Sequence, residues 1–165
     1  MMDDGKVLHA CHDDVHVLRY IGDIRYTLSP SIDRFLEEVF AGPKPAGFVI
    51  DLTETDSIDS TNLGLLARIA LRMQALDAPQ VTLLSNRHDI NSVLTSMALD
   101  EVFDIVEDTG LETGVSREVP QENADRETLA RTLIDSHRAL MDLSEHNREM
   151  FQNVVATLEK NGHSG

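Results

Sequence analysis

The stretch Asp59-Ser60-Thr61-Asn62-Leu63-Gly64 decides the fold, because it lies where a buried strand gives way to an apolar helix. The run Gly47-Phe-Val-Ile-Asp-Leu52 is short and almost wholly apolar, as expected of a central strand covered on both faces. Turn-forming residues follow at 53–57, and from Leu63 apolar residues recur at helical spacing. The sequence therefore predicts a helix that begins near Ser60, with Asp59 and Ser60 placed to bind the free amides of its first turn.

The same stretch is part of a longer segment that resembles a known signature. Residues 49–66, Val-Ile-Asp-Leu-Thr-Glu-Thr-Asp-Ser-Ile-Asp-Ser-Thr-Asn-Leu-Gly-Leu-Leu, resemble that of the STAS family, the domain of bacterial anti-sigma factor antagonists. In that family a strand with an apolar-Asp-Leu ending leads to Asp-Ser-Ser/Thr-Gly-Leu-Gly. The segment Val17–Arg25 is similar to the family's second strand and its Gly-Asp-Ile turn into the first helix. The resemblance covers roughly residues 5 to 107 and implies a mixed, mostly parallel α/β sheet with helices packed against it.

The resemblance also implies a function and its site. By that match Ser60 is the phosphoacceptor, with Thr61 the less favoured neighbour, and residues 59–64 (Asp59, Ser60, Thr61, Asn62, Leu63 and Gly64) bind the partner. The unphosphorylated family member binds an anti-sigma factor and frees a sigma factor. Phosphorylation blocks this binding, the anti-sigma factor often being the serine kinase. Asn62 departs from the usual Gly, so we expect a side chain near the phosphoacceptor that alters the fit of the partner.

A PP2C-type phosphatase resets the switch in this family, and the variant sequence with its C-terminal extension looks like a proteobacterial subgroup whose phosphatase is a response-regulator output domain. Two alternatives remain open. One is a STAS scaffold or interaction module that regulates another signalling protein without an anti-sigma factor. The other is a small-ligand-binding module, or an enzyme with Ser60 as nucleophile, although the sequence offers no evident general base beside it.

Composition excludes several classes of partner. The net charge is -15 and Trp is absent, which argues against nucleic acid and anionic membranes as partners. A single cysteine, Cys11, fits a reducing cytosol, and no leader or long apolar run is evident, so we expect a cytoplasmic protein. No phosphate loop, GxSxG elbow or paired carboxylates appear, so neither a cofactor nor catalysis is predicted.

The rest of residues 1–107 predicts the remaining elements of one domain. Apolar runs bounded by turn residues predict two opening strands and two further strands. Apolar residues at helical spacing predict a helix after the hairpin and a shorter helix before the last strand. The expected strands are Lys6–Cys11 and Val15–Tyr20, joined at His12–Asp14, then Gln80–Ser85 and Val102–Val106; the expected helices are a helix opened at Ser29–Ser31 and ended by Gly42–Pro43, and a shorter one at Asp89–Met97.

The last third of the chain changes in character. Residues 108–123 are polar and acidic and predict a linker. Residues 124–165 predict a helical extension, either one long helix or a hairpin broken near Ser144–Asn147. Its apolar stripe includes His137. The extension either folds back on the domain or forms a homodimer or partner contact.

Two histidine groups invite other interpretations. His9 and Cys11 share a strand face with His12 and His16 nearby, but a tetrahedral metal site needs four converging ligands, and no CxxC spacing occurs. His137 follows Asp135-Ser136 but lacks the surroundings of a phosphotransfer histidine, so we expect an ordinary helix histidine at the surface or partly buried.

Overall fold

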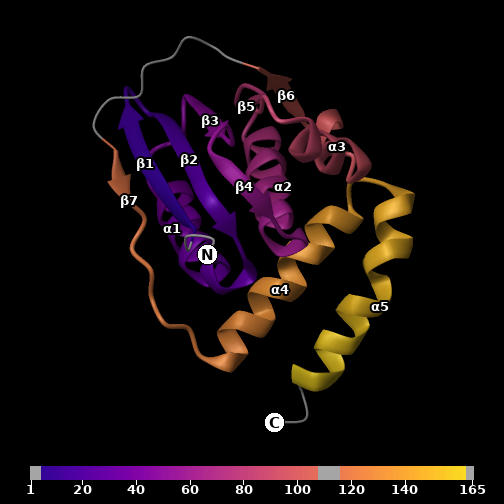
Figure 1. The fold of residues 1–165 in the computed structure, drawn as a ribbon. Helices are drawn as coiled ribbons and strands as arrows, with labels where there is room; N and C mark the ends of the chain where they lie inside the picture. The colour runs from indigo at the N-terminus through magenta and orange to yellow at the C-terminus, as the bar shows by residue number, and fades with distance from the viewer. Residues whose placement is uncertain (1–4, 108–115, 163–165) are drawn as a thin grey trace.

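The computed structural model describes residues 5–107 and 116–162, which form one mixed sheet with helices packed against it (Figure 1). The seven strands run in the order β6-β5-β3-β2-β1-β7, with β4 paired to β2 outside this path. Their bounds are β1 Lys6–His12, β2 Val15–Ile24, β3 Gly47–Asp51, β4 Thr55–Ile58, β5 Val81–Leu84, β6 Phe103–Val106 and β7 Arg117–Glu118. The helices are α1 Ser29–Ala41, α2 Ser60–Ala75, α3 His88–Ser96, α4 Arg126–Met141 and α5 Glu145–Gly162, with short 3-10 turns at Tyr26–Leu28 and Leu99–Glu101.

The sheet confirms the predicted fold class. The pairs β2–β3, β2–β4, β3–β5 and β5–β6 are parallel, whereas the pairs β1–β2 and β1–β7 are antiparallel. The opening hairpin turns at Asp13 and Asp14, whose φ angles of 51° and 62° are those of a tight turn suited to twisted strands. Strand β2 alternates between buried Leu18, Tyr20 and Ile24 and half-buried neighbours, so one face of the sheet carries most of the core.

Strand β2 is longer than predicted and pairs with two successive strands. Residues Val15–Arg19 pair with β3, whereas Gly22–Ile24 pair with β4 after a register shift at Gly22, where φ is 87°. The predicted turn into the first helix at Gly22–Ile24 is therefore wrong, as is the predicted turn over Thr55–Ser57. Both segments are extended because each supplies the other with backbone hydrogen bonds, and the Thr55 hydroxyl donates to the Tyr20 carbonyl at 2.8 Å.

Part of the stretch predicted as a linker is paired with the sheet. Residues 108–115 lie outside the described part of the chain, but β7 pairs antiparallel with β1 at the sheet edge. Val119 then joins the core at 5% exposure. The chain continues past the end of the sheet to α4 (Figure 1).

The C-terminal extension is a helical hairpin that folds back on the domain. Helix α4 packs against α2 and α1, and α5 lies outside it, packed against α4 (Figure 1). The hairpin alternative of the sequence prediction is thus confirmed. The break lies at residues 142–144, slightly before the predicted Ser144–Asn147, because α5 already begins at Glu145. Leu140 on α4 and Phe151 and Val155 on α5 are buried, so this hairpin extends the core.

Candidate functional site

Ser60 is the first residue of α2, directly after β4, and Asp59 caps the helix. One carboxylate oxygen of Asp59, Oδ1, accepts from the backbone amide of Asn62 at 3.1 Å and from its side-chain Nδ2 at 2.9 Å. This cap satisfies a helix amide that would otherwise lack a partner, and it places the Ser60 hydroxyl at the positive end of the helix dipole. The predicted helix start is confirmed. Ser60 is half-buried.

The four residues after Ser60 are buried rather than presented on the surface. Thr61 is 4% exposed, Asn62 0% and Leu63 1%, and Gly64 is also buried. The Asn62 side chain turns back to Asp59 within the first turn of α2, and its effect on the fit of the partner stays a prediction. Its backbone is helical, so the position does not demand glycine.

His137 on α4 contacts Ser60 directly. The imidazole Nε2 lies 2.9 Å from the Ser60 Oγ, while Nδ1 lies 2.7 Å from the carbonyl oxygen of Leu133. A carbonyl only accepts, so in the neutral ring Nδ1 carries the proton and Nε2 accepts from the serine hydroxyl. The ring is 5% exposed and packs against Phe151. His137 was expected at the surface or partly buried, and neither its nearly complete burial nor its contact with Ser60 was predicted. The signal was present in the sequence, because His137 occupies a position of the apolar stripe.

Gly64 marks the closest approach of α2 to α4. A Cβ atom built on Gly64 would lie 2.1 Å from the carbonyl oxygen of Ser136 and 2.8 Å from its Cα. No side chain fits at that separation, and the obstacle is backbone that cannot rotate away. The glycine therefore lets α4 cross α2 one turn after Ser60, which brings His137 to the serine hydroxyl.

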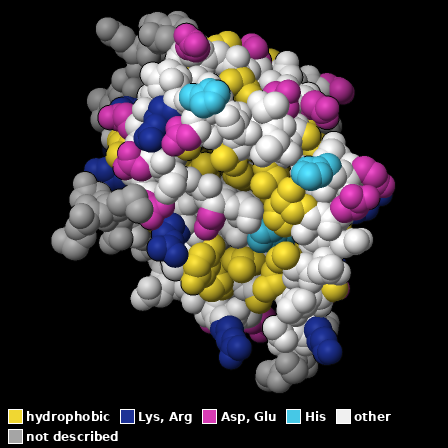
Figure 2. Space-filling view, turned by 45° about the vertical axis from the view of Figure 1, so that its right-hand side comes forward, with side chains coloured by type: hydrophobic (Ala, Val, Ile, Leu, Met, Phe, Trp, Pro, Cys, Tyr) yellow, Lys and Arg dark blue, Asp and Glu magenta, His cyan; other side chains and the backbone are white. Residues whose placement is uncertain are grey.

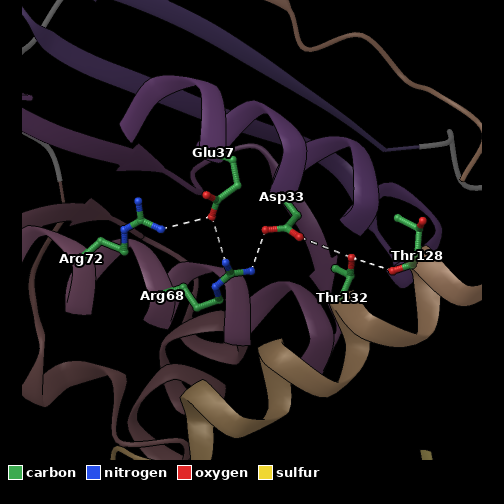
Figure 3. Close-up of polar contacts among 6 residues, drawn as sticks. All are labelled: Asp33, Glu37, Arg68, Arg72, Thr128 and Thr132. Atoms are coloured by element: carbon green, nitrogen blue, oxygen red, sulfur yellow. Dashed lines mark hydrogen bonds and ion pairs between the residues drawn. The ribbon is translucent and has the colours of Figure 1, made fainter. Parts of the chain in front are cut away.

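A polar network joins α4 to the domain farther along the same seam (Figure 3). Arg68 on α2 donates to Asp33 at 2.6 Å and to Glu37 at 3.1 Å, both on α1. The hydroxyl of Thr132, 2% exposed on α4, lies 3.4 Å from the other Asp33 oxygen. Arg72 also reaches Glu37. Three helices thus share one set of carboxylates.

An open groove of about 300 Å³ runs beside this network between α2 and α4. Arg68, Arg72 and Arg138 line it, and each already has an acidic partner, Glu159 in the case of Arg138. Neither Ser60 nor His137 lines the groove. Figure 2 views the molecule from the side of α4 and α5. Hydrophobic side chains gather around a histidine on this face, with acidic groups toward the margins.

The histidines of the first hairpin pair with each other. His9 Nε2 lies 2.9 Å from His16 Nδ1, and the His9 ring packs edge-on against Phe35. Burial, followed by the charge of His16, lowers the pKa of His9 to about 4. Cys11 is exposed. Within residues 5–107 and 116–162, no three His, Cys, Asp or Glu side chains are arranged to hold a metal ion.

The comparisons with known proteins agree on the fold. The family model of the STAS domain matches residues 7–111, well over half of the chain. The crystal structure of an anti-sigma factor antagonist from Mycobacterium paratuberculosis is similar, with a TM-score of 0.52 and 21% sequence identity over 62% of this chain and 85% of that chain. No curated protein matches the sequence. None of the helices in the described ranges combines the length and apolar character needed to cross a bilayer.

Proposed function

The chain belongs to the STAS domain family, and we propose that it is an anti-sigma factor antagonist controlled by phosphorylation of Ser60. The observation that carries the proposal is the position of Ser60. Its hydroxyl stands at the amino end of α2, beside the Asp59 cap and at the end of β4, within the family segment. The similar solved antagonist supports the class of partner. Such a role places the protein in the bacterial cytoplasm.

The charge of a phosphate makes this position suitable for a switch. Phosphorylation adds nearly two negative charges and three strong acceptor oxygens. Within the domain, the α2 amino end offsets part of that charge, by about 1 kcal/mol. At a docked interface the dianion loses water and costs several kcal/mol unless a cation meets it. A loss of about 3 kcal/mol already weakens binding roughly a hundredfold. The fold therefore survives phosphorylation and the complex does not.

The remaining parts of the switch follow the family pattern. The unphosphorylated chain binds an anti-sigma factor and releases a sigma factor, and the anti-sigma factor or a separate serine kinase modifies Ser60. A PP2C-type phosphatase, of the response-regulator kind in the proteobacterial subgroup, removes the phosphate. Thr61 is the poorer acceptor because it is 4% exposed whereas Ser60 is half-buried. The chain itself acts by binding and is not an enzyme in this scheme.

The test is a pull-down from the lysate of the native cell with four full-length baits. Wild type, Ser60→Ala and Ser60→Asp are compared with Thr61→Val, a control that removes the neighbouring hydroxyl at nearly constant volume. We expect a kinase-fold or anti-sigma protein on wild type, Ser60→Ala and Thr61→Val, and its loss on Ser60→Asp. Phosphopeptide analysis should place phosphate on Ser60. The same partners on all four baits, with no phosphate at Ser60, would contradict the proposal.

One observation favours a second candidate, a serine hydrolase. Ser60 and His137 are arranged as a nucleophile and a base, and the Leu133 carbonyl orients the imidazole. The base that the sequence did not reveal is thus present in space, although the groove near α4 is lined by neither residue. A fluorophosphonate probe distinguishes the two functions. We expect no more labelling of wild type than of Ser60→Ala, whereas labelling that depends on both Ser60 and His137 would favour the hydrolase.

A homodimer through the C-terminal helices remains a prediction. Met150 and Val154, one turn apart on α5, are each 40% exposed, so they are the apolar groups available for a contact between copies. Sedimentation velocity of wild type and Met150→Lys tests it. A dimer that the lysine abolishes would support this contact, and a monomer at high concentration would remove it.

A further inference from the structure

We propose that the α4–α5 hairpin occupies the docking surface around Ser60, so that the anti-sigma partner binds only chains in which the hairpin has moved off α2. The inference rests on the proposed function for the identity of the partner. Whether the hairpin covers Ser60 does not depend on the proposed function, because the cover is a property of this chain. The hairpin lies C-terminal to the matched family segment, which ends at residue 111.

The α4–α5 hairpin partly covers Ser60, which is half-buried. Its hydroxyl is held by His137, a residue of α4 that is 5% exposed. One turn along α2, the backbone of Ser136 sits so close to Gly64 that no added methyl group would fit. A kinase needs the serine oxygen free and in line with a phosphoryl donor, whereas the described hydroxyl is engaged by His137. The described conformation therefore hinders both modification and docking.

The hairpin is held together by contacts of its own, so it can leave the domain as a unit. Contacts within it are independent of the domain: Arg138 pairs with Glu159, the His137 ring packs on Phe151, and Asn147 Nδ2 donates to the Leu140 carbonyl at 2.9 Å. These contacts persist if α4 and α5 move together.

Contacts from the hairpin to the domain are partly polar, beside the buried Leu140. Asn147 Nδ2 donates to the Met97 carbonyl at 2.7 Å, and Thr132 reaches Asp33. The open groove along the seam leaves part of α2 uncovered by α4. Water can replace each of these polar contacts once the hairpin has moved, which lowers the cost of opening.

Movement of the hairpin sets the apparent affinity of the partner. If the partner recognises only the open form, its apparent dissociation constant equals the intrinsic constant divided by the open fraction. A substitution that weakens the seam without touching residues 59–64 must therefore tighten partner binding. If no part of the chain competed with the partner, the same substitution would weaken partner binding or leave it unchanged.

A thiol in place of the serine hydroxyl measures the cover without any partner. Cys11 is the only cysteine, so a Cys11→Ser, Ser60→Cys full-length chain carries one thiol at the site. We expect it to react with Ellman's reagent at least about a hundredfold more slowly when folded than in denaturant. Adding Asn147→Ala, which removes the hydrogen bond from the hairpin to the Met97 carbonyl, should raise the folded rate about tenfold.

Two controls separate hairpin movement from other effects. Gln152→Ala changes an exposed residue of α5 and should leave the rate within twofold. Leu83→Ala lowers global stability from β5, away from the hairpin, and should also leave the rate unchanged if exposure comes from hairpin movement. Gly64→Ala provides a second opening variant if Asn147→Ala does not fold by circular dichroism. All variants are compared at one pH, so the effect of the helix end on the thiol cancels.

The binding arm uses the anti-sigma protein recovered by the pull-down. Asn147→Ala should bind it about tenfold more tightly than wild type, and Gln152→Ala equally. A thiol introduced by Ser60→Cys that reacts at the denatured rate, or a rate indifferent to both opening variants, would overturn the cover. Equal affinity of wild type and Asn147→Ala would overturn the competition. A pull-down that recovers no anti-sigma protein would instead remove the proposed function, and the thiol rates would still decide whether the hairpin covers Ser60.

Discussion

Gly64→Ala should destabilise the protein, although the same change in most helices is stabilising. Alanine gains about 1 kcal/mol over glycine in a helix interior. Here the new Cβ would lie 2.1 Å from the Ser136 carbonyl oxygen, so α4 must retreat by roughly 1 Å to restore normal contact. Overpacking of this kind costs about 1–3 kcal/mol, and more where the obstacle is backbone. We therefore expect a net loss of about 2 kcal/mol in the free energy of unfolding.

Urea unfolding followed by circular dichroism measures that change, which corresponds to a fall of about 4–8 °C in the melting temperature. Gly42→Ala is the matched control. A Cβ at Gly42 meets nothing closer than 3.5 Å, and its φ of -87° suits any residue. We expect it to be neutral or to stabilise by up to about 1 kcal/mol. A Gly64→Ala protein as stable as the Gly42→Ala protein would refute the close crossing of α2 and α4.

Three further outcomes follow from the same contacts. Asp59→Ala should lower the free energy of unfolding by about 1–2 kcal/mol in urea titrations, because the buried Asn62 side chain and amide lose their common acceptor; an unchanged midpoint would exclude the cap. Leu140→Ala should cost about 2–5 kcal/mol by calorimetry, since this α4 side chain is fully buried, and a cost below about 1 kcal/mol would mean that the hairpin adds little core. The pKa of His9 is lowered to about 4 in the folded protein, so as pH falls from 6.5 the unfolded chain takes up this proton before the folded chain does. The free energy of unfolding contributed by neutral His9 is therefore fully present above pH 6.5 and is lost between pH 6.5 and about 4. After discounting for its partial exposure we expect a loss of about 1–2 kcal/mol, which His9→Gln should flatten; an equally steep pH dependence in that variant would assign the loss to other groups.

The elements that depend on local chemistry could be predicted from the sequence alone. The apolar run at residues 47–51 becomes β3, and Ser29–Ser31 and Gly42 bound α1 as predicted. Asp13 and Asp14 in the first hairpin turn and Asp59 at the α2 cap also act through their nearest neighbours in the chain. These outcomes are readable because periodicity, caps and turn residues act over a few positions. The resemblance to the STAS signature rests on the same local segment.

Only the tertiary structure decided the elements whose stability comes from distant partners. Strand β4 carries turn-forming residues, and it is extended because the second half of β2 offers it hydrogen bonds. Part of the expected linker pairs with β1 for the same reason. The sequence left open whether the final helices fold back, because an apolar stripe does not name the surface that it covers. The contact of Ser60 with His137 joins residues 77 positions apart, and it exists because Gly64 permits α4 to cross α2 at that turn.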